Sequence, residues 1–212
     1  AIPPRMICSM LAKLMSFLLL GIVRFLTGSQ ARCYGCPPKA EQRIYFANHQ
    51  SHADLVMIWA ALPEELRSIT RPIAARDYWT KSDFKRWITT AVFNAVYVDR
   101  ERQGDEDPLQ PLIDALQSGD SLIIFPEGTR GHAAEPQAFK AGLYNLALRF
   151  PDVVLVPAWI ANVQRVMPKG EVVPVPVLCS VTFGAPIRLE PGEERRAFLD
   201  RARAAVIALR DV

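Results

Sequence analysis

Two short polar motifs interrupt an otherwise apolar sequence. The first, residues 48–54, reads Asn-His-Gln-Ser-His-Ala-Asp and places Asp54 five positions after His49. A carboxylate that hydrogen-bonds one imidazole nitrogen fixes the tautomer and leaves the other nitrogen as a general base. On one continuous helix the two side chains would point about 140° apart. We therefore expect His49 in a loop and Asp54 in the first helical turn, which the capping-box pattern Ser51-x-x-Asp54 supports.

This first motif also has structural interpretations. Asp54 alone would serve as a helix cap, with His49 bonded to a loop carbonyl. A zinc site is a second alternative, since Cys33 and Cys36 precede His49 and His52 at nearly the spacing of a two-Cys, two-His finger. The histidine spacing is too short for such a finger, and a strand-like segment precedes the histidines. We therefore predict no metal, and we interpret His52 as a bystander.

The second motif follows a buried, strand-like run at residues 122–125 and continues as Pro-Glu-Gly-Thr-Arg over residues 126–130. Proline ends the strand and glycine permits a tight turn. Backbone N–H groups and the bidentate fork of Arg130 suit a phosphate. Glu127 would accept from a substrate hydroxyl or position Arg130, and Lys140 is a further candidate cation. The alternative is a structural turn with a surface ion pair.

Alternating strand and helix patterns surround both motifs. Such alternation predicts an α/β domain with a mostly parallel or mixed central sheet flanked by helices. A linker is expected at residues 28–41. Strands are expected near residues 43–47, 68–74, 92–98, 121–125, 153–160 and 177–183, and helices near residues 55–62, 79–90, 108–117, 139–150 and 192–210.

The N-terminal segment, residues 6–27, is rich in Leu, Ile, Met and Phe. Lys13 and Arg24 interrupt it, so its uninterrupted apolar run, residues 14–23, is only ten residues long. A helix that crosses a bilayer needs roughly 20. We expect an interfacial, membrane-associating helix at residues 1–30, followed by a catalytic domain at residues 31–212. A cleaved signal peptide and a buried core helix are the alternatives.

Composition limits the classes of protein that fit. The chain has 212 residues, 50% of them hydrophobic, and a net charge of +3. This length fits one globular domain, and the charge is too mild to indicate nucleic acid. Basic residues gather at residues 67–86, where they would meet phosphates or an anionic membrane.

Together, the two motifs resemble those of the glycerolipid acyltransferase family, which includes the 1-acylglycerol-3-phosphate acyltransferases. That family carries Asn-His-x-x-x-x-Asp and, later, Phe-Pro-Glu-Gly-Thr-Arg; both are intact here, and the likeness extends over about residues 43–186. The resemblance implies that His49, oriented by Asp54, deprotonates a hydroxyl of a lysophospholipid or glycerol phosphate. The alkoxide then attacks the thioester of acyl-CoA or acyl-carrier protein directly. No cofactor and no metal are implied.

The resemblance also implies a set of substrate-binding residues that hold the acceptor's phosphate and hydroxyls. Two positions depart from the family pattern: Asn94 stands where a glycine is usual, and Ala75 stands where many members have a lysine, with Arg76 beside it as a substitute. The implied binding residues are Arg100, Glu127, Gly128, Thr129 and Arg130.

The expected activity is that of a membrane-associated O-acyltransferase of phospholipid biosynthesis, converting 1-acyl-sn-glycerol-3-phosphate to phosphatidate at the cytoplasmic face of the inner or plasma membrane. Glycerol-3-phosphate, a lyso-ornithine lipid and other lysolipids are alternative acceptors. The alternatives of another class are an acyl-thioester hydrolase, in which His49 activates water, and a non-catalytic membrane-binding domain. We interpret Ser51 as a cap, and a base without a Ser or Cys nucleophile favours direct transfer.

Overall fold

The central sheet carries the architecture. The computed structural model describes residues 4–27, 30–51, 53–99, 107–131, 133, 135–161 and 179–212, which form a seven-stranded sheet in the order β1-β7-β6-β2-β5-β3-β4. The five strands from β6 to β4 run parallel, and β7 and β1 run in the opposite direction. The predicted α/β fold with a mixed sheet is confirmed. The strands are β1 (Gln30–Cys33), β2 (Arg43–Ala47), β3 (Thr70–Ala75), β4 (Val96–Val98), β5 (Ser121–Ile124), β6 (Val154–Ala161) and β7 (Ser180–Phe183).

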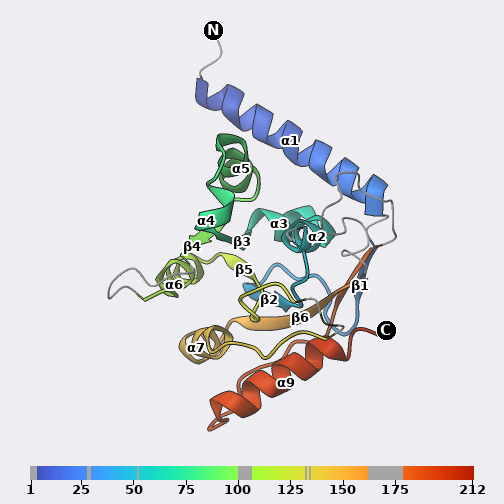
Figure 1. The fold of residues 1–212 in the computed structure, drawn as a ribbon, viewed down its shortest axis with the longest axis vertical. Coiled ribbons are helices and arrows are strands. Elements are labelled where there is room, and N and C mark those ends of the chain that lie inside the picture. The colour runs from blue at the N-terminus through green and yellow to red at the C-terminus, as the bar shows by residue number, and fades with distance from the viewer. Residues whose placement is uncertain are drawn as a thin grey trace.

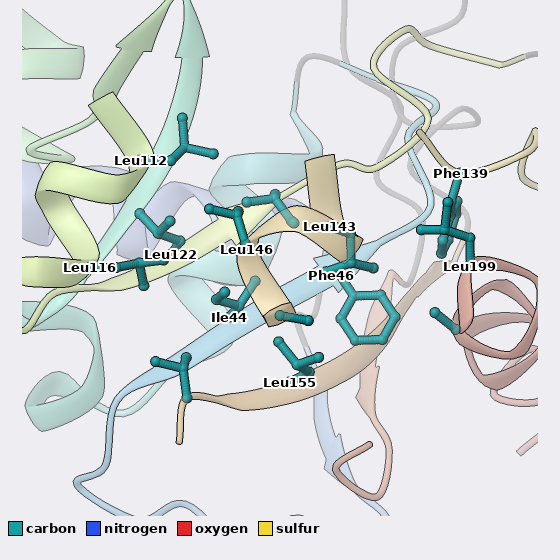
Figure 2. Close-up of a cluster of buried hydrophobic side chains, with 14 of the residues drawn as sticks. Ile44, Phe46, Leu112, Leu116, Leu122, Phe139, Leu143, Leu146, Leu155 and Leu199 are labelled. Carbon is teal, nitrogen blue, oxygen red and sulfur yellow. The ribbon is translucent and has the colours of Figure 1, made fainter. Parts of the chain in front are cut away.

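Helices cover both faces of the sheet (Figure 1). All five residues of β2 are buried, as expected for a parallel strand with helices on either side. Tyr45 and Ala47 pack on the face that α2 covers, and Ile44 and Phe46 pack on the opposite face (Figure 2). The helices are α1 (Pro4–Thr27), α2 (Asp54–Ala61), α3 (Glu64–Ser68), α4 (Arg76–Trp79), α5 (Asp83–Trp87), α6 (Gln110–Gln117), α7 (Gly142–Arg149) and α9 (Arg195–Ile207), with a π-helical turn η1 (Ile88–Val92).

The N-terminal helix α1 lies across α2 and η1, on the far side of α2 from the sheet (Figure 1). Leu19, Leu20 and Val23 pack against the core. The opposite, solvent-facing side of α1 is apolar as well, with exposed Met10, Leu11, Leu14, Phe17, Leu18 and Ile22. Among the described residues no helix is long and apolar enough to span a membrane.

Several elements differ from the sequence prediction. The helix expected at residues 79–90 is divided into α4, α5 and η1, because Ser82 begins a new helix by accepting a hydrogen bond from the backbone N–H of Lys85. The chain therefore reaches β4 only at Val96, and residues 92–95 are not strand. The linker contains β1, and the short helix α3 was not predicted.

Asn94 adopts a left-handed conformation, with φ of 47°. Asparagine tolerates this region better than most residues that carry a Cβ. Its carbonyl accepts a hydrogen bond of 2.7 Å from the guanidinium of Arg71, which holds the turn before β4. Asparagine thus serves at the position where the resembling family usually has glycine.

Candidate functional site

His49 and Asp54 meet between the end of β2 and the start of α2. His49 lies in the loop, and Asp54 is the first residue of α2. The distance from His49 Nδ1 to Asp54 Oδ2 is 2.9 Å. The carboxylate is 1% exposed, whereas the imidazole retains 16% exposure. The contact predicted from the sequence is present, and a buried carboxylate fixes a partly exposed imidazole.

The same carboxylate oxygen organises the loop that carries the histidine. Asp54 Oδ2 accepts from the backbone N–H of Gln50 at 2.6 Å and of Ser51 at 2.8 Å. With Nδ1–H donating to Asp54, the other ring nitrogen, Nε2, carries a free lone pair. Phe125 stacks on the imidazole, with ring centroids 4.2 Å apart and an angle of 16° between the planes. The ring is therefore held by its edge and by its face, as a general base requires.

The capping box predicted at Ser51 forms only in part. Asp54 reaches back to the N–H of Ser51, but the Ser51 hydroxyl accepts from Ala53 rather than from Asp54. The backbone N–H of Asp54 bonds to the Ser51 carbonyl instead, so the helix begins at Asp54 and not two residues earlier. The full capping box does not form because Asp54 Oδ2 also binds His49 and Gln50 in the loop.

The negative charge of Asp54 also affects a buried cysteine, Cys179. Burial raises the pKa of Cys179 to about 11, and the negative charge of Asp54 adds to the shift. The side chain is buried and remains a thiol at neutral pH. A buried neutral thiol is a poor nucleophile.

Glu127 ties the second motif to the first. Its side chain is buried, and its Oε1 accepts from the backbone N–H of His49 at 2.7 Å. Oε2 accepts from the N–H of Gln137 at 2.8 Å, and the N–H of Gly131 donates to the carbonyl of His49 at 2.9 Å. Both oxygens already hold backbone groups, and no ion pair with Arg130 occurs among the described residues. The geometry makes Glu127 a positioning residue for the histidine loop.

Asn48 is a site residue to which sequence analysis gave no role. It is 1% exposed, donates to the carbonyl of Ile160 at 3.0 Å and accepts from the N–H of Ile160 at 2.8 Å. Its amide thus extends the pairing of β2 with β6 beyond the end of the strand and fixes the start of the histidine loop. The sequence signal that could have identified Asn48 is its position directly after a buried strand.

Three of the remaining predicted binding residues, Gly128, Thr129 and Arg130, lie in an exposed part of the turn. Gly128 has a φ of 71°, which favours glycine. Thr129 and Arg130 are exposed, and in the part of the chain that the structure describes the Arg130 guanidinium makes no hydrogen bond or ion pair. Arg100 and His52 lie outside the described residues.

An apolar cavity of about 270 Å³ opens beside the histidine. Its wall includes His49 and the stacked Phe125. The lining also includes aliphatic side chains from the sheet, from α6 and the residue before it, and from α7: Ile73, Val98, Leu109, Leu112, Leu143 and Leu146. The arrangement places the imidazole of His49 at the wall of a space suited to hydrocarbon. No group of three or more metal-ligating side chains gathers within the described ranges.

The chain has an α/β fold with a His–Asp pair beside an apolar cavity, and comparison with known proteins identifies its family. Residues 33–161 match the Acyltransferase family. The chain belongs to this family. It is an acyltransferase, similar in sequence to proteins named 1-acyl-sn-glycerol-3-phosphate acyltransferase, which belong to glycerophospholipid synthesis.

Individual relatives and a solved structure agree with this assignment. The 1-acyl-sn-glycerol-3-phosphate acyltransferase alpha of Homo sapiens is 28% identical over 205 residues, which cover 93% of this chain and 69% of the relative. A protein named Taffazin from Dictyostelium discoideum is 30% identical over 145 residues, covering 63% of this chain and 49% of the relative. The crystal structure of the 1-acyl-sn-glycerophosphate acyltransferase PlsC from Thermotoga maritima shares the fold, with a TM-score of 0.68, 22% identity and coverage of 95% of this chain and 86% of that one.

Proposed function

We propose that the enzyme transfers an acyl chain from acyl-CoA or acyl-carrier protein to the free hydroxyl of 1-acyl-sn-glycerol-3-phosphate, forming phosphatidate. The observation that carries this proposal is the His49–Asp54 contact at the wall of the apolar cavity. Nε2 of His49 takes the hydroxyl proton as the acceptor oxygen attacks the thioester carbonyl. The carbon–sulfur bond then breaks, and the leaving thiolate receives the proton from the imidazolium. Asp54 stabilises that imidazolium.

The cavity is proposed as the site of a hydrocarbon chain. Leu112, Leu143 and Leu146 present methyl groups to it from two different helices. Burial of each methylene is worth about 0.8 kcal/mol, so an acyl chain in this space would hold its reactive end near the histidine.

Arg130 is proposed as a cation for the acceptor's phosphate, with Gly128, Thr129 and Arg100 as further contacts. The support is its exposed guanidinium, which has no partner among the described residues, in the turn that Glu127 anchors. We expect Arg130→Ala to raise the KM for a phosphorylated acceptor more than the KM for the acyl donor. Equal losses for both substrates would contradict this role.

Association with a membrane surface is proposed through α1, with residues 31–212 as the catalytic domain. Six large apolar side chains on the outer face of α1 are exposed, and Phe17 among them is 74% exposed. Close to α1 (Figure 1), α5 exposes Phe84 and also Arg86, which pairs with Asp83 at 2.9 Å. Exposed apolar side chains along one face of a helix suit the interface of a bilayer, and we place the enzyme at the cytoplasmic face of the inner or plasma membrane.

The membrane proposal is tested by sedimentation with anionic vesicles. Phe17→Asp is expected to release the protein from vesicles. Leu148→Asp is the matched control, because Leu148 is 61% exposed on α7, away from α1. Equal binding of the two variants would refute the proposed orientation.

The catalytic proposal is tested with His49→Ala in an assay of acyl-CoA with lysophosphatidate. Loss of a general base typically lowers the rate by about 10²–10⁴-fold. Turnover close to wild type in a folded variant would exclude His49 as the base. Mass spectrometry of products from a panel of glycerol-3-phosphate, lyso-ornithine lipid and lysophospholipids identifies the acceptor, and acyl release without any acceptor would indicate the hydrolase.

A further inference from the structure

Lys140 lies against the turn of the second motif. Its backbone N–H donates to the carbonyl of Pro126 at 2.8 Å, and its side chain crosses directly over Gly128. A Cβ built on Gly128 would lie 2.6 Å from Nζ of Lys140 and 2.9 Å from both Cδ and Cε. Since any side chain at position 128 would displace the lysine, the glycine serves two purposes here, a positive φ and the passage of the lysine stem.

The ammonium group faces the same cavity as the proposed base. The described lining of the cavity includes one acidic side chain, Asp99, and one lysine, Lys140, in addition to the imidazole of His49. Asp99 is already paired, because Nε of Arg76 donates to both its oxygens at 3.1 and 3.2 Å. No hydrogen bond or ion pair of the Lys140 side chain occurs within the described residues.

Neither Ala75 nor Arg76 presents a free positive charge to the cavity in the described structure. Ala75, which stands where many of the resembling proteins have lysine, lines the cavity itself. The guanidinium of Arg76 is directed to Asp99 and to the ring of Tyr97, 5.5 Å from its centroid. Arg76 therefore does not substitute for that lysine, and among the described residues that line the cavity the unpaired cation is Lys140.

We propose that Lys140 forms a phosphate subsite for the acceptor, at the mouth of the cavity next to the Gly128 turn. The proposal rests on the proposed function, since it names the group that the same site recognises. In a lysophosphatidate the phosphate is separated from the reacting hydroxyl by only a short glycerol segment. His49 and Lys140 both line one cavity, so a proton acceptor and a cation border the same space. The phosphates of an acyl-CoA are separated from the thioester by the whole pantetheine arm.

Direct binding tests this subsite without turnover. A soluble short-chain lysophosphatidate and the corresponding monoacylglycerol, which lacks the phosphate, are titrated into wild type, Lys140→Met and Lys140→Arg by calorimetry in the absence of donor. A hydrogen bond to a charged group is worth enough to predict at least about a tenfold rise in Kd for lysophosphatidate in Lys140→Met. Monoacylglycerol binding stays unchanged, and Lys140→Arg retains most of the affinity. Lys39→Met, at an exposed position away from the cavity lining, is the control.

The outcomes separate this proposal from the proposed function. If the wild type prefers another lysophospholipid, the proposed acceptor is wrong, and the same comparison is made with that lipid, which also carries a phosphate. An unchanged Kd in Lys140→Met, equal losses for both ligands, or a wild type that binds no phosphate-bearing lysolipid overturns the subsite. A rise in the KM for acyl-CoA alone would assign the lysine to the donor phosphates and also overturn it.

Discussion

Asp54→Asn is the substitution that most directly tests how the site handles a proton. The side chains are nearly isosteric, so an amide oxygen in the place of Oδ2 would still accept from Gln50, Ser51 and His49. The amide nitrogen would then lie where Oδ1 is, an atom with no hydrogen-bond partner among the described residues. The substitution therefore removes the negative charge while leaving the loop in place.

The expected loss follows from the geometry of the pair. The histidine nitrogen and the carboxylate oxygen are 2.9 Å apart in a site where the carboxylate is 1% exposed. With about 4 Å between charge centres and an effective dielectric constant of about 20, the attraction between carboxylate and imidazolium is about 4 kcal/mol. Because the imidazolium forms only as the proton moves, this energy is lost from the transition state, which corresponds to about 10³-fold in kcat.

The assay measures phosphatidate by mass spectrometry at saturating acyl-CoA over a range of lysophosphatidate concentrations. We expect kcat to fall about 10³-fold and KM to change little. Asp120→Asn is the control, since Asp120 pairs with Arg71 outside the cavity lining. In a His49→Ala background, Asp54→Asn should cost little more, because the two residues act as a unit. A folded Asp54→Asn enzyme with less than a tenfold loss would refute the electrostatic argument.

Three further predictions concern stability and the supporting contacts. Asn48→Ala leaves both backbone groups of its β6 partner without hydrogen bonds, so urea unfolding should show a loss of roughly 3 kcal/mol; a loss near zero would mean that water replaces the amide. In Glu127→Gln the amide can accept from only one of the two backbone N–H groups, so we expect the free energy of unfolding to fall by about 2 kcal/mol and kcat to fall as well. A variant that is less stable but has unchanged kcat would show that Glu127 contributes to folding only. The hydrogen bond from Arg201 lowers the pKa of Glu193 below its ordinary value of 4.5, so this carboxylate stabilises the fold above pH 4.5 and loses that contribution as the pH falls through its folded-state pKa. Glu193→Gln should be less stable than wild type by up to about 1 kcal/mol at neutral pH, with the difference vanishing in acid; a gap independent of pH would contradict the assignment.

The hydrophobic pattern of the sequence was sufficient to predict the elements in which one local signal dominates. The strand predicted at residues 43–47 coincides with β2, because a continuous apolar run bounded by polar residues is what a strand buried on both faces requires. The helix after the first motif was predicted within one residue at each end, since its apolar stretch ends directly before Pro63. In both segments the local preference and the packing agree.

Elsewhere, pairing partners decided the structure. The short segment Gln30–Cys33 becomes strand β1 only because it pairs with β7, which is distant in sequence. One helix was predicted over residues 79–90, but the cap at Ser82 and the π-helical turn divide this segment. Neither feature carries a strong hydrophobic period, and composition does not reveal a distant partner.

For the site itself, the sequence determined which residue types are present and that His49 and Asp54 meet at a strand-to-helix junction. Their contact is local, spanning five positions, so spacing and helix geometry were enough. Only the tertiary structure decided that Glu127 faces the backbone of the histidine loop, that Asn48 joins β6 and that Lys140 crosses Gly128. These contacts link segments separated in sequence, and they follow from the order in which the strands pair, because adjacent parallel strands bring the loops at their carboxyl ends together.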